Sequence, residues 1–171
     1  MSITIKRNEE NVSHLLSQIE QGYLDPAAMP RGSVIQRRIL SRSLDYSTSS
    51  SSWSVIDKIT FSPILAGSLL RLSINYSVGA QAGSDFLFRF TVNEGANKFE
   101  IERTGVQRVH DTQIKDALES RFQWEHYHEC DNVTARTYYV EGMNFSNSGL
   151  VWFHTYGSSA TSWFTIEEIK Q

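Results

Sequence analysis

The sequence predicts a mainly β protein, an antiparallel jelly-roll β-sandwich preceded by a short N-terminal helix and an extended arm. Apolar and polar residues alternate in short runs from Gly32 to the C-terminus. Turn-forming residues separate these runs, as antiparallel hairpins require. Eight or nine such strands suit a two-sheet sandwich or jelly roll.

The composition indicates one domain with an appended arm. The chain has 171 residues, and its 16 basic and 19 acidic residues give a formal charge of −3. This balance gives no general attraction to nucleic acid. No run approaches the roughly 18 apolar residues of a membrane span, so we expect no membrane insertion. The single cysteine, Cys130, excludes an internal disulfide and fits a reducing cytosol or a particle assembled there.

Residues 1–30 are expected to form an anchoring arm that contains one short amphipathic helix. Asn8 is placed to cap this helix, and Gly22 stands where a C-terminal cap belongs. The apolar positions between them have helical spacing: Val12, Leu15, Leu16 and Ile19. About three turns are too few to be stable alone in water. The apolar stripe therefore has to pack on its own sandwich, on a sister chain or on another protein.

The predicted sandwich comprises residues 31–171 and follows an extended, non-helical connector with two prolines, Tyr23–Pro30. Its first segment carries four basic residues and no acidic one: Arg31, Arg37, Arg38 and Arg42. These arginines are either solvated strand residues or contacts to an acidic docking partner.

The clearest strands are Leu70–Val78, with apolar residues on one face, and Phe86–Val92, which repeats the pattern. Apolar residues in Thr112–Ser120 have helical spacing instead, which predicts a short helical insertion. The other expected strands are Ser33–Leu44, Trp53–Phe61, Lys98–Arg103, Phe122–Glu129, Ala135–Gly142, Gly149–Thr155 and Ser162–Ile169.

Four segments carry a family resemblance: Met29–Gln36, Trp53–Pro63, Leu69–Ile74 and Trp163–Ile169. In this order they resemble the small C-terminal domains of tailed-bacteriophage virion appendages, such as tail-fibre and head-decoration proteins. The resemblance loosely covers residues 29–171. It implies a jelly roll that assembles as a homotrimer, with an N-terminal segment fixed to the particle and the outer end facing a host surface or the capsid.

The expected function is therefore that of a non-enzymatic structural component of a bacteriophage virion, a short tail fibre or appendage assembled in the host cytoplasm. A capsid decoration protein and a free lectin-like trimeric binding module are the alternatives. Docking to other virion proteins would use the apolar stripe and the basic residues Arg31, Arg37 and Arg38. A host surface glycan or protein would be bound by exposed aromatic residues, for which the candidates are Tyr138, Trp152 and Tyr156.

Two constellations are candidates for chemistry. His126 and His128 project to the same side of a strand, as two imidazoles sharing a metal must, and threefold symmetry would multiply them. They also continue an apolar face begun by Phe122 and Trp124, which favours a half-buried sheet face or a subunit contact. Glu100 and Glu102 are expected on one strand face, as a glycan-hydrolysing acid pair requires. They flank Ile101 in an ordinary solvent-facing alternation, however, which is the favoured interpretation, and we expect neither an enzyme nor a cofactor.

Overall fold

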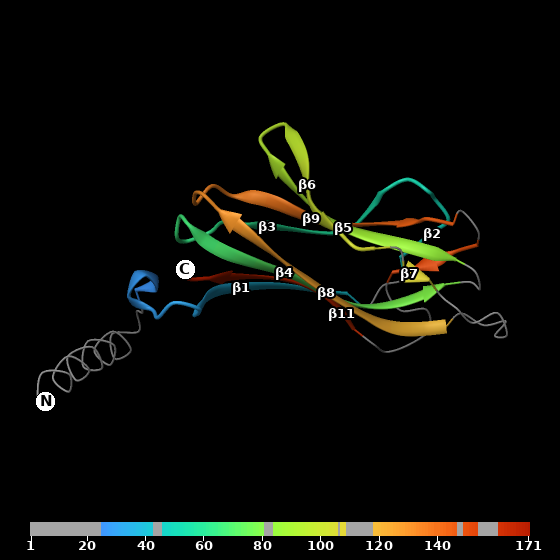
Figure 1. Cartoon of the computed structure of the whole chain (residues 1–171), viewed down its shortest axis with the longest axis horizontal. Coiled ribbons are helices and arrows are strands. Elements are labelled where there is room, and N and C mark those ends of the chain that lie inside the picture. The colour runs from blue at the N-terminus through green and yellow to red at the C-terminus, as the bar shows by residue number, and fades with distance from the viewer. Residues whose placement is uncertain are drawn as a thin grey trace, which may run out of the picture.

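The computed structural model describes residues 25–42, 46–80, 84–105, 107–108, 118–146, 149–153 and 161–171. Two antiparallel sheets face each other as layers of a sandwich (Figure 1). The predicted fold class is therefore confirmed. No helix in the described part of the chain is both long enough and apolar enough to span a bilayer.

The first sheet has six strands, and its long members lie in the order β1, β11, β4, β8. Two short strands, β10 and β2, extend it beside the end of β4. The bounds are β1 Val34–Arg42, β2 Ser47–Thr48, β4 Ser68–Ala80, β8 Leu118–Cys130, β10 Val151–Trp152 and β11 Ser162–Ile169.

The second sheet has five strands in the order β3, β9, β5, β6, with β7 paired to β5. Among the eight long strands, successive strands alternate between the layers except for the β5–β6 hairpin, and β11 returns to lie between β1 and β4. This is the strand order of a jelly roll. The bounds are β3 Ser54–Phe61, β5 Asp85–Glu94, β6 Asn97–Arg103, β7 Gln107–Arg108 and β9 Arg136–Asn144.

The strands differ from the expected segments mainly at their ends. Ser162–Ile169 has the predicted bounds, whereas β8 begins at Leu118. The predicted helix over Thr112–Ser120 is therefore wrong for its last three residues, because pairing with β4 continues to Leu118↔Ala80. The remainder of that segment lies outside the described residues.

The connector before β1 is also less extended than predicted. Pro26–Ala28 forms one 3₁₀ turn (η1), because the Ala27 amide donates to the Asp25 side chain at 2.9 Å and proline is tolerated at a first helical position. The Gly32 amide donates to the Lys170 carbonyl at 2.8 Å. The N-terminal side of the sandwich is thus tied to the end of β11, where Figure 1 places the C-terminus.

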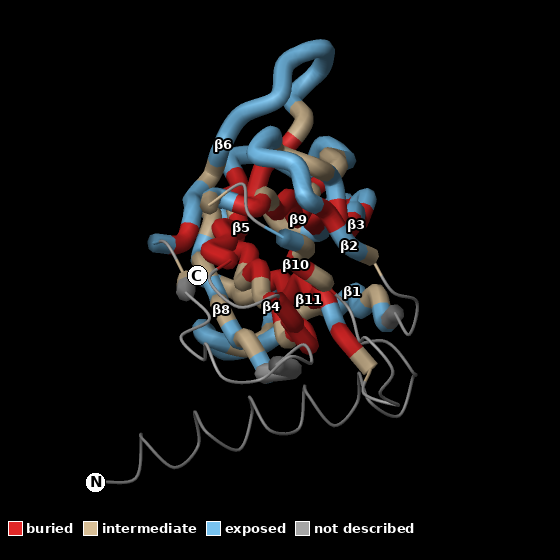
Figure 2. Tube along the Cα trace, turned by 90° about the vertical axis from the view of Figure 1, so that its right-hand side faces the viewer, coloured by how far each residue is buried: buried red, intermediate tan, exposed pale blue. Residues whose placement is uncertain are grey.

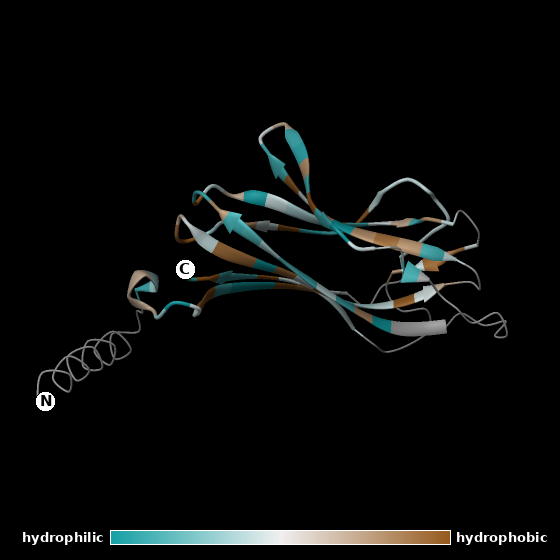
Figure 3. Cartoon of the chain, viewed as in Figure 1, coloured by the Kyte–Doolittle hydropathy of each residue, from teal (hydrophilic) through white to brown (hydrophobic). Residues whose placement is uncertain are grey.

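The core lies between the two layers, where Figure 2 shows the buried residues gathered. Hydrophobic and hydrophilic bands alternate along the long strands because successive side chains face opposite sides (Figure 3). Phe88 is fully buried at the centre of this core. Its ring stacks on Phe122 at 5.1 Å and meets Phe153 edge-on at 5.0 Å between centroids. Tyr76 donates a hydrogen bond to buried Asp57 at 2.6 Å.

One buried carboxylate, that of Glu168, fixes the connection between β3 and β4. It is fully buried on β11 and accepts hydrogen bonds from the backbone amides of Ile64 and Leu65, each at 2.8 Å. The side-chain amide of Gln36 donates to it at 2.7 Å. Gln36 also donates to the Ser62 carbonyl, so β1, β11 and the loop are joined at one point. A buried charge is tolerated here because several donors surround it.

Candidate functional site

A groove of about 720 Å³ lies on the outer face of the first sheet and is called the outer groove here. Its lining comes from all four long strands. The strand register groups the outward side chains into rungs that cross the sheet. The central rung consists of Ile39, Thr165, Ser73 and Glu125, one residue from each of β1, β11, β4 and β8. All four line the groove.

The next rung toward the start of β11 holds Trp163, Asn75 and Gln123. The indole of Trp163 remains 37% exposed although it stands on an inner strand of the sheet. The Arg121 guanidinium lies 5.5 Å from its ring centroid, a cation–π contact. Arg121 also donates to the Thr161 carbonyl at 2.9 Å. The aromatic side chain is therefore braced from β8 and still lines the groove.

The rung on the other side is charged and internally paired. Glu167 is nearly buried between two arginines: Arg71 donates to it through Nε at 2.8 Å, and Arg37 Nε lies 3.3 Å away. The hydrogen bond to Glu167 raises the pKa of the Arg71 guanidinium. Arg37, a predicted docking residue, thus has an acidic partner within its own chain. Arg31 and Arg38, the other two, are exposed.

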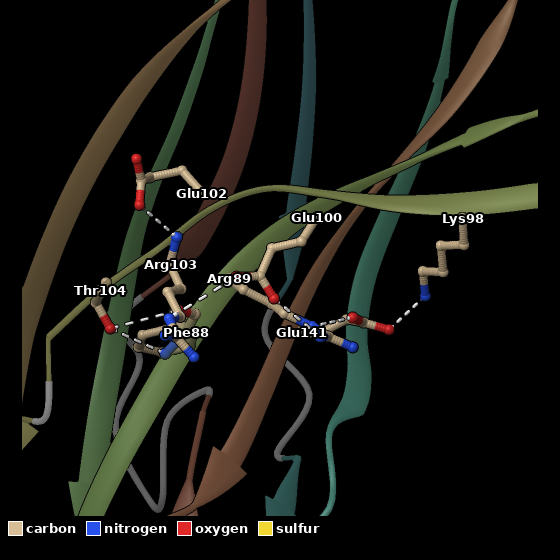
Figure 4. A network of polar contacts seen from close by, with 8 residues as sticks. All are labelled: Phe88, Arg89, Lys98, Glu100, Glu102, Arg103, Thr104 and Glu141. Carbon is tan, nitrogen blue, oxygen red and sulfur yellow. Dashed lines mark hydrogen bonds and ion pairs between the residues drawn. The ribbon is translucent and has the colours of Figure 1, made fainter.

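A second polar cluster lies on the outer face of the other sheet (Figure 4). Its centre is the buried carboxylate of Glu141 on β9, which binds Lys98 and accepts from Arg89 Nε at 2.7 Å. Arg89 also reaches Glu100 at 3.1 Å and lies 4.4 Å from the Trp53 ring centroid. These paired charges hold β5, β6 and β9 together, which is a structural role.

The predicted carboxylate pair does not share a face. Thr91 pairs with Glu100 and Phe90 with Glu102, so β6 contains one extra residue, a β-bulge, between them. Glu100 consequently faces Arg89 on the outer face, whereas Glu102 turns away from it (Figure 4) and approaches His126 Nδ1 at 3.9 Å. The expectation of a shared strand face is wrong, because the bulge shifts the alternation by one residue.

The two histidines lie on the inward face of β8, paired with core positions of β4: His126 with Leu72 and His128 with Leu70. Both are half-buried. The His128 ring lies 5.9 Å from that of Tyr138, and its Nε2 atom has no hydrogen-bond partner among the described residues. Within the same residues, no three His, Cys, Asp or Glu side chains gather as a metal site would require.

His128 should make the protein less stable in mild acid. Burial lowers the pKa of His128 from its ordinary 6.5, and the positive charge of Arg136 acts in the same direction. Below pH 6.5 the unfolded chain therefore binds a proton that the folded chain does not, and the free energy of unfolding falls. Urea unfolding would measure the free energy of unfolding at about pH 7.5 and at about pH 5.5. The decrease between these two pH values should be smaller for His128→Phe than for the unaltered chain. Equal losses in both would contradict this assignment.

The aromatic residues predicted to bind a host surface differ in how far they are exposed. Tyr138 is fully buried on the inner face of β9, where its hydroxyl lies 3.7 Å from Cys130 Sγ. Burial raises the pKa values of both groups. A surface-binding role for Tyr138 is therefore wrong, because its pairing with Ile59 and Val92 places it over the core. Trp152 is half-buried on β10. Tyr156 and the stripe Val12, Leu15, Leu16 and Ile19 lie outside the described residues.

The outer groove was not predicted from the sequence, and Trp163, the exposed aromatic residue that lines it, was not among the candidate residues. The available signal was the alternation of β11, where exposed Trp163 precedes buried Phe164. A large aromatic residue at the outward phase of a strand indicates a surface role more than a core role. The other lining residues carry no comparable signal.

Comparison with known proteins gives little further information. No family model and no curated protein matches the chain. One solved structure that matches is a chain in "Structure of infectious bursal disease virus Gx strain", at 8% sequence identity and a TM-score of 0.35. The match covers 80% of the present chain and 31% of that chain. This similarity is too low to bear on function.

Proposed function

We propose that this protein is a non-enzymatic structural component of a bacteriophage virion, a short tail fibre or appendage that displays its sandwich outward and binds through the outer groove. The virion assignment rests on the sequence resemblance. The observation that carries the binding role is the groove itself, in which exposed Ile39 and Trp163 stand on a hydrogen-bonded sheet. Rigid sheets hold binding groups with little ordering cost.

A binding role fits the arrangement of the side chains better than catalysis does. The bulge in β6 separates Glu100 from Glu102, and Glu100 is already paired with Arg89. His126 and His128 face the interior of the sandwich. Catalysis of the kind considered for these residues requires groups that converge on one reacting atom.

The position of the groove supports outward display. The arm enters the sandwich beside Lys170, at the end of β11. Trp163 stands near the start of the same strand, about 20 Å away at the usual rise per residue. The groove lies across the middle of the sheet, and attachment through the arm would leave its Trp163 side farther from the anchor than its Arg37 side.

The proposed assembly is a homotrimer whose arms dock on tail or capsid proteins. Sedimentation equilibrium of the full chain at micromolar concentration should give a trimer mass. Particles made from the genome that encodes the chain should carry it in cryo-electron micrographs or by immunogold labelling. A monomer that is absent from those particles would refute the proposal. Location on the head with greater heat resistance of the particle would favour a capsid decoration protein, and ligand binding without any particle would favour a free lectin-like module.

Docking through the arm has its own test in the full-length chain. Leu15→Glu together with Leu16→Glu should abolish incorporation into particles, because charges would replace part of the predicted apolar stripe. His14→Glu together with Ser17→Glu adds the same charges on the opposite side of that predicted helix and should leave incorporation unchanged. Equal incorporation of both variants would show that the stripe is not the anchor. Circular dichroism would confirm that the sandwich still folds.

A further inference from the structure

The shape of the outer groove follows from the size of the side chains in its rungs. The two middle residues of the central rung, Thr165 and Ser73, are short. The tall side chains of Trp163 and Gln123 stand on one side, and Arg37 bounds the other. The groove therefore runs across the strands from Ile39 on β1 to Glu125 on β8. Four strands at the usual spacing give it a length of about 14 Å.

The lining of the outer groove combines exposed apolar side chains, neutral polar groups and two charges. Trp163 and Ile39 offer exposed apolar surface, 37% and 51% of each residue. Between and beside them lie neutral groups that both donate and accept hydrogen bonds: the hydroxyls of Ser73 and Thr165 and the amides of Asn75 and Gln123. Two charges of opposite sign line the groove: Glu125 stands at its β8 end, and Arg37 stands on one side near its β1 end.

This lining excludes several kinds of ligand. A nucleic acid or another polyanion would find few free cations among the described residues, because Arg37 in the lining lies 3.3 Å from Glu167 and the neighbouring Arg121 is held by the Trp163 ring and the Thr161 carbonyl. An apolar helix or lipid would cover the hydroxyl and amide groups of the floor without forming hydrogen bonds to them, which disfavours its binding. A ligand that has apolar faces and many hydroxyls satisfies both parts of the lining.

We propose that the outer groove binds a short, uncharged oligosaccharide. The C–H face of one sugar ring stacks on the indole of Trp163, and the ring hydroxyls exchange hydrogen bonds with Asn75 and Gln123. Glu125 accepts from a hydroxyl at the β8 end. The groove volume, about 720 Å³, lies in the range of small-molecule sites. This inference rests on the binding role proposed above and not on the virion assignment.

The test uses the labelled full-length chain on a printed array of defined bacterial-surface oligosaccharides, followed by calorimetric titration of each bound compound. Trp163→Ala should weaken binding at least about tenfold. Trp163→Phe keeps an aromatic face and should retain part of the affinity. Trp53→Ala is the matched control, since Trp53 lies beside Arg89 on the other sheet, and it should bind normally. Binding should persist at about 0.5 M salt, because stacking and neutral hydrogen bonds are little screened.

Three results would overturn the inference. The chain could bind no array compound, or bind one with equal affinity after Trp163→Ala. Alternatively, Trp163→Ala could lower the molecular mass that sedimentation equilibrium gives. That result would show that the groove is a contact between copies of the chain. Gln123→Ala, on an exposed position of β8, keeps the test valid if Trp163→Ala does not fold. Loss of array binding with normal incorporation into particles would separate this site from virion docking.

Discussion

Phe88→Ala should lower the free energy of unfolding by about 3–5 kcal/mol, the cost of removing a large aromatic side chain from a packed core. Phe88 is fully buried, and its ring contacts four others: Tyr76, Phe86, Phe122 and Phe153. These rings come from both sheets and from the segment after β10. A cavity at this point would weaken the contact between the two layers, and the surrounding rings are too rigid to fill it.

Urea denaturation followed by tryptophan fluorescence would measure this loss. Phe99→Ala is the matched control, because Phe99 is 48% exposed on β6 and its removal should cost less than about 1 kcal/mol. Phe88→Leu fills part of the cavity and should give an intermediate value. Similar losses for Phe88→Ala and Phe99→Ala would contradict the assignment of Phe88 to the centre of the core.

Glu168→Ala should cost about 3–4 kcal/mol by a different mechanism. The carboxylate accepts hydrogen bonds from the amides of Ile64 and Leu65 and from Gln36. Alanine would leave these donors without their acceptor in a buried site, and each orphaned donor costs about 1–3 kcal/mol. Glu168→Gln keeps one oxygen and should cost less.

Thermal unfolding and hydrogen exchange would separate this effect from a general loss of packing. Exchange at the Ile64 and Leu65 amides should accelerate in Glu168→Ala before the whole protein unfolds, because their acceptor is gone. Glu129→Ala, at an exposed position of β8, should change neither measurement. Unchanged protection of the two amides in Glu168→Ala would show that the carboxylate does not hold the loop.

The strands could be predicted from the sequence where the alternation of apolar and polar residues determines the structure. In Leu70–Val78 the apolar phase became the inner face of β4, because a sheet with one buried face fixes its register. For Tyr138 the phase was available but was not used. It has the same phase as Val140, and both are fully buried on the inner face of β9.

The candidate sites could not be predicted in the same way, because they depend on which strands pair. The bulge that separates Glu100 from Glu102 is defined only by the partner strand β5. The central rung of the outer groove joins residues 39, 73, 125 and 165, which no local pattern connects. Sequence could indicate that His126 and His128 share a face. Which face they share depended on the pairing of β8 with β4.

The place of β11 between β1 and β4 has a consequence for the order of folding. Residues 162–169 of this strand pair with residues 34–42 of β1 and 69–75 of β4, which are far away along the chain. Such long-range pairing forms late and slowly. Until it forms, β1 lacks its neighbour, and Trp163 and Thr165 are missing from the groove. Ligand binding should therefore appear only in the last step of refolding, so that its recovery would report completion of the sheet.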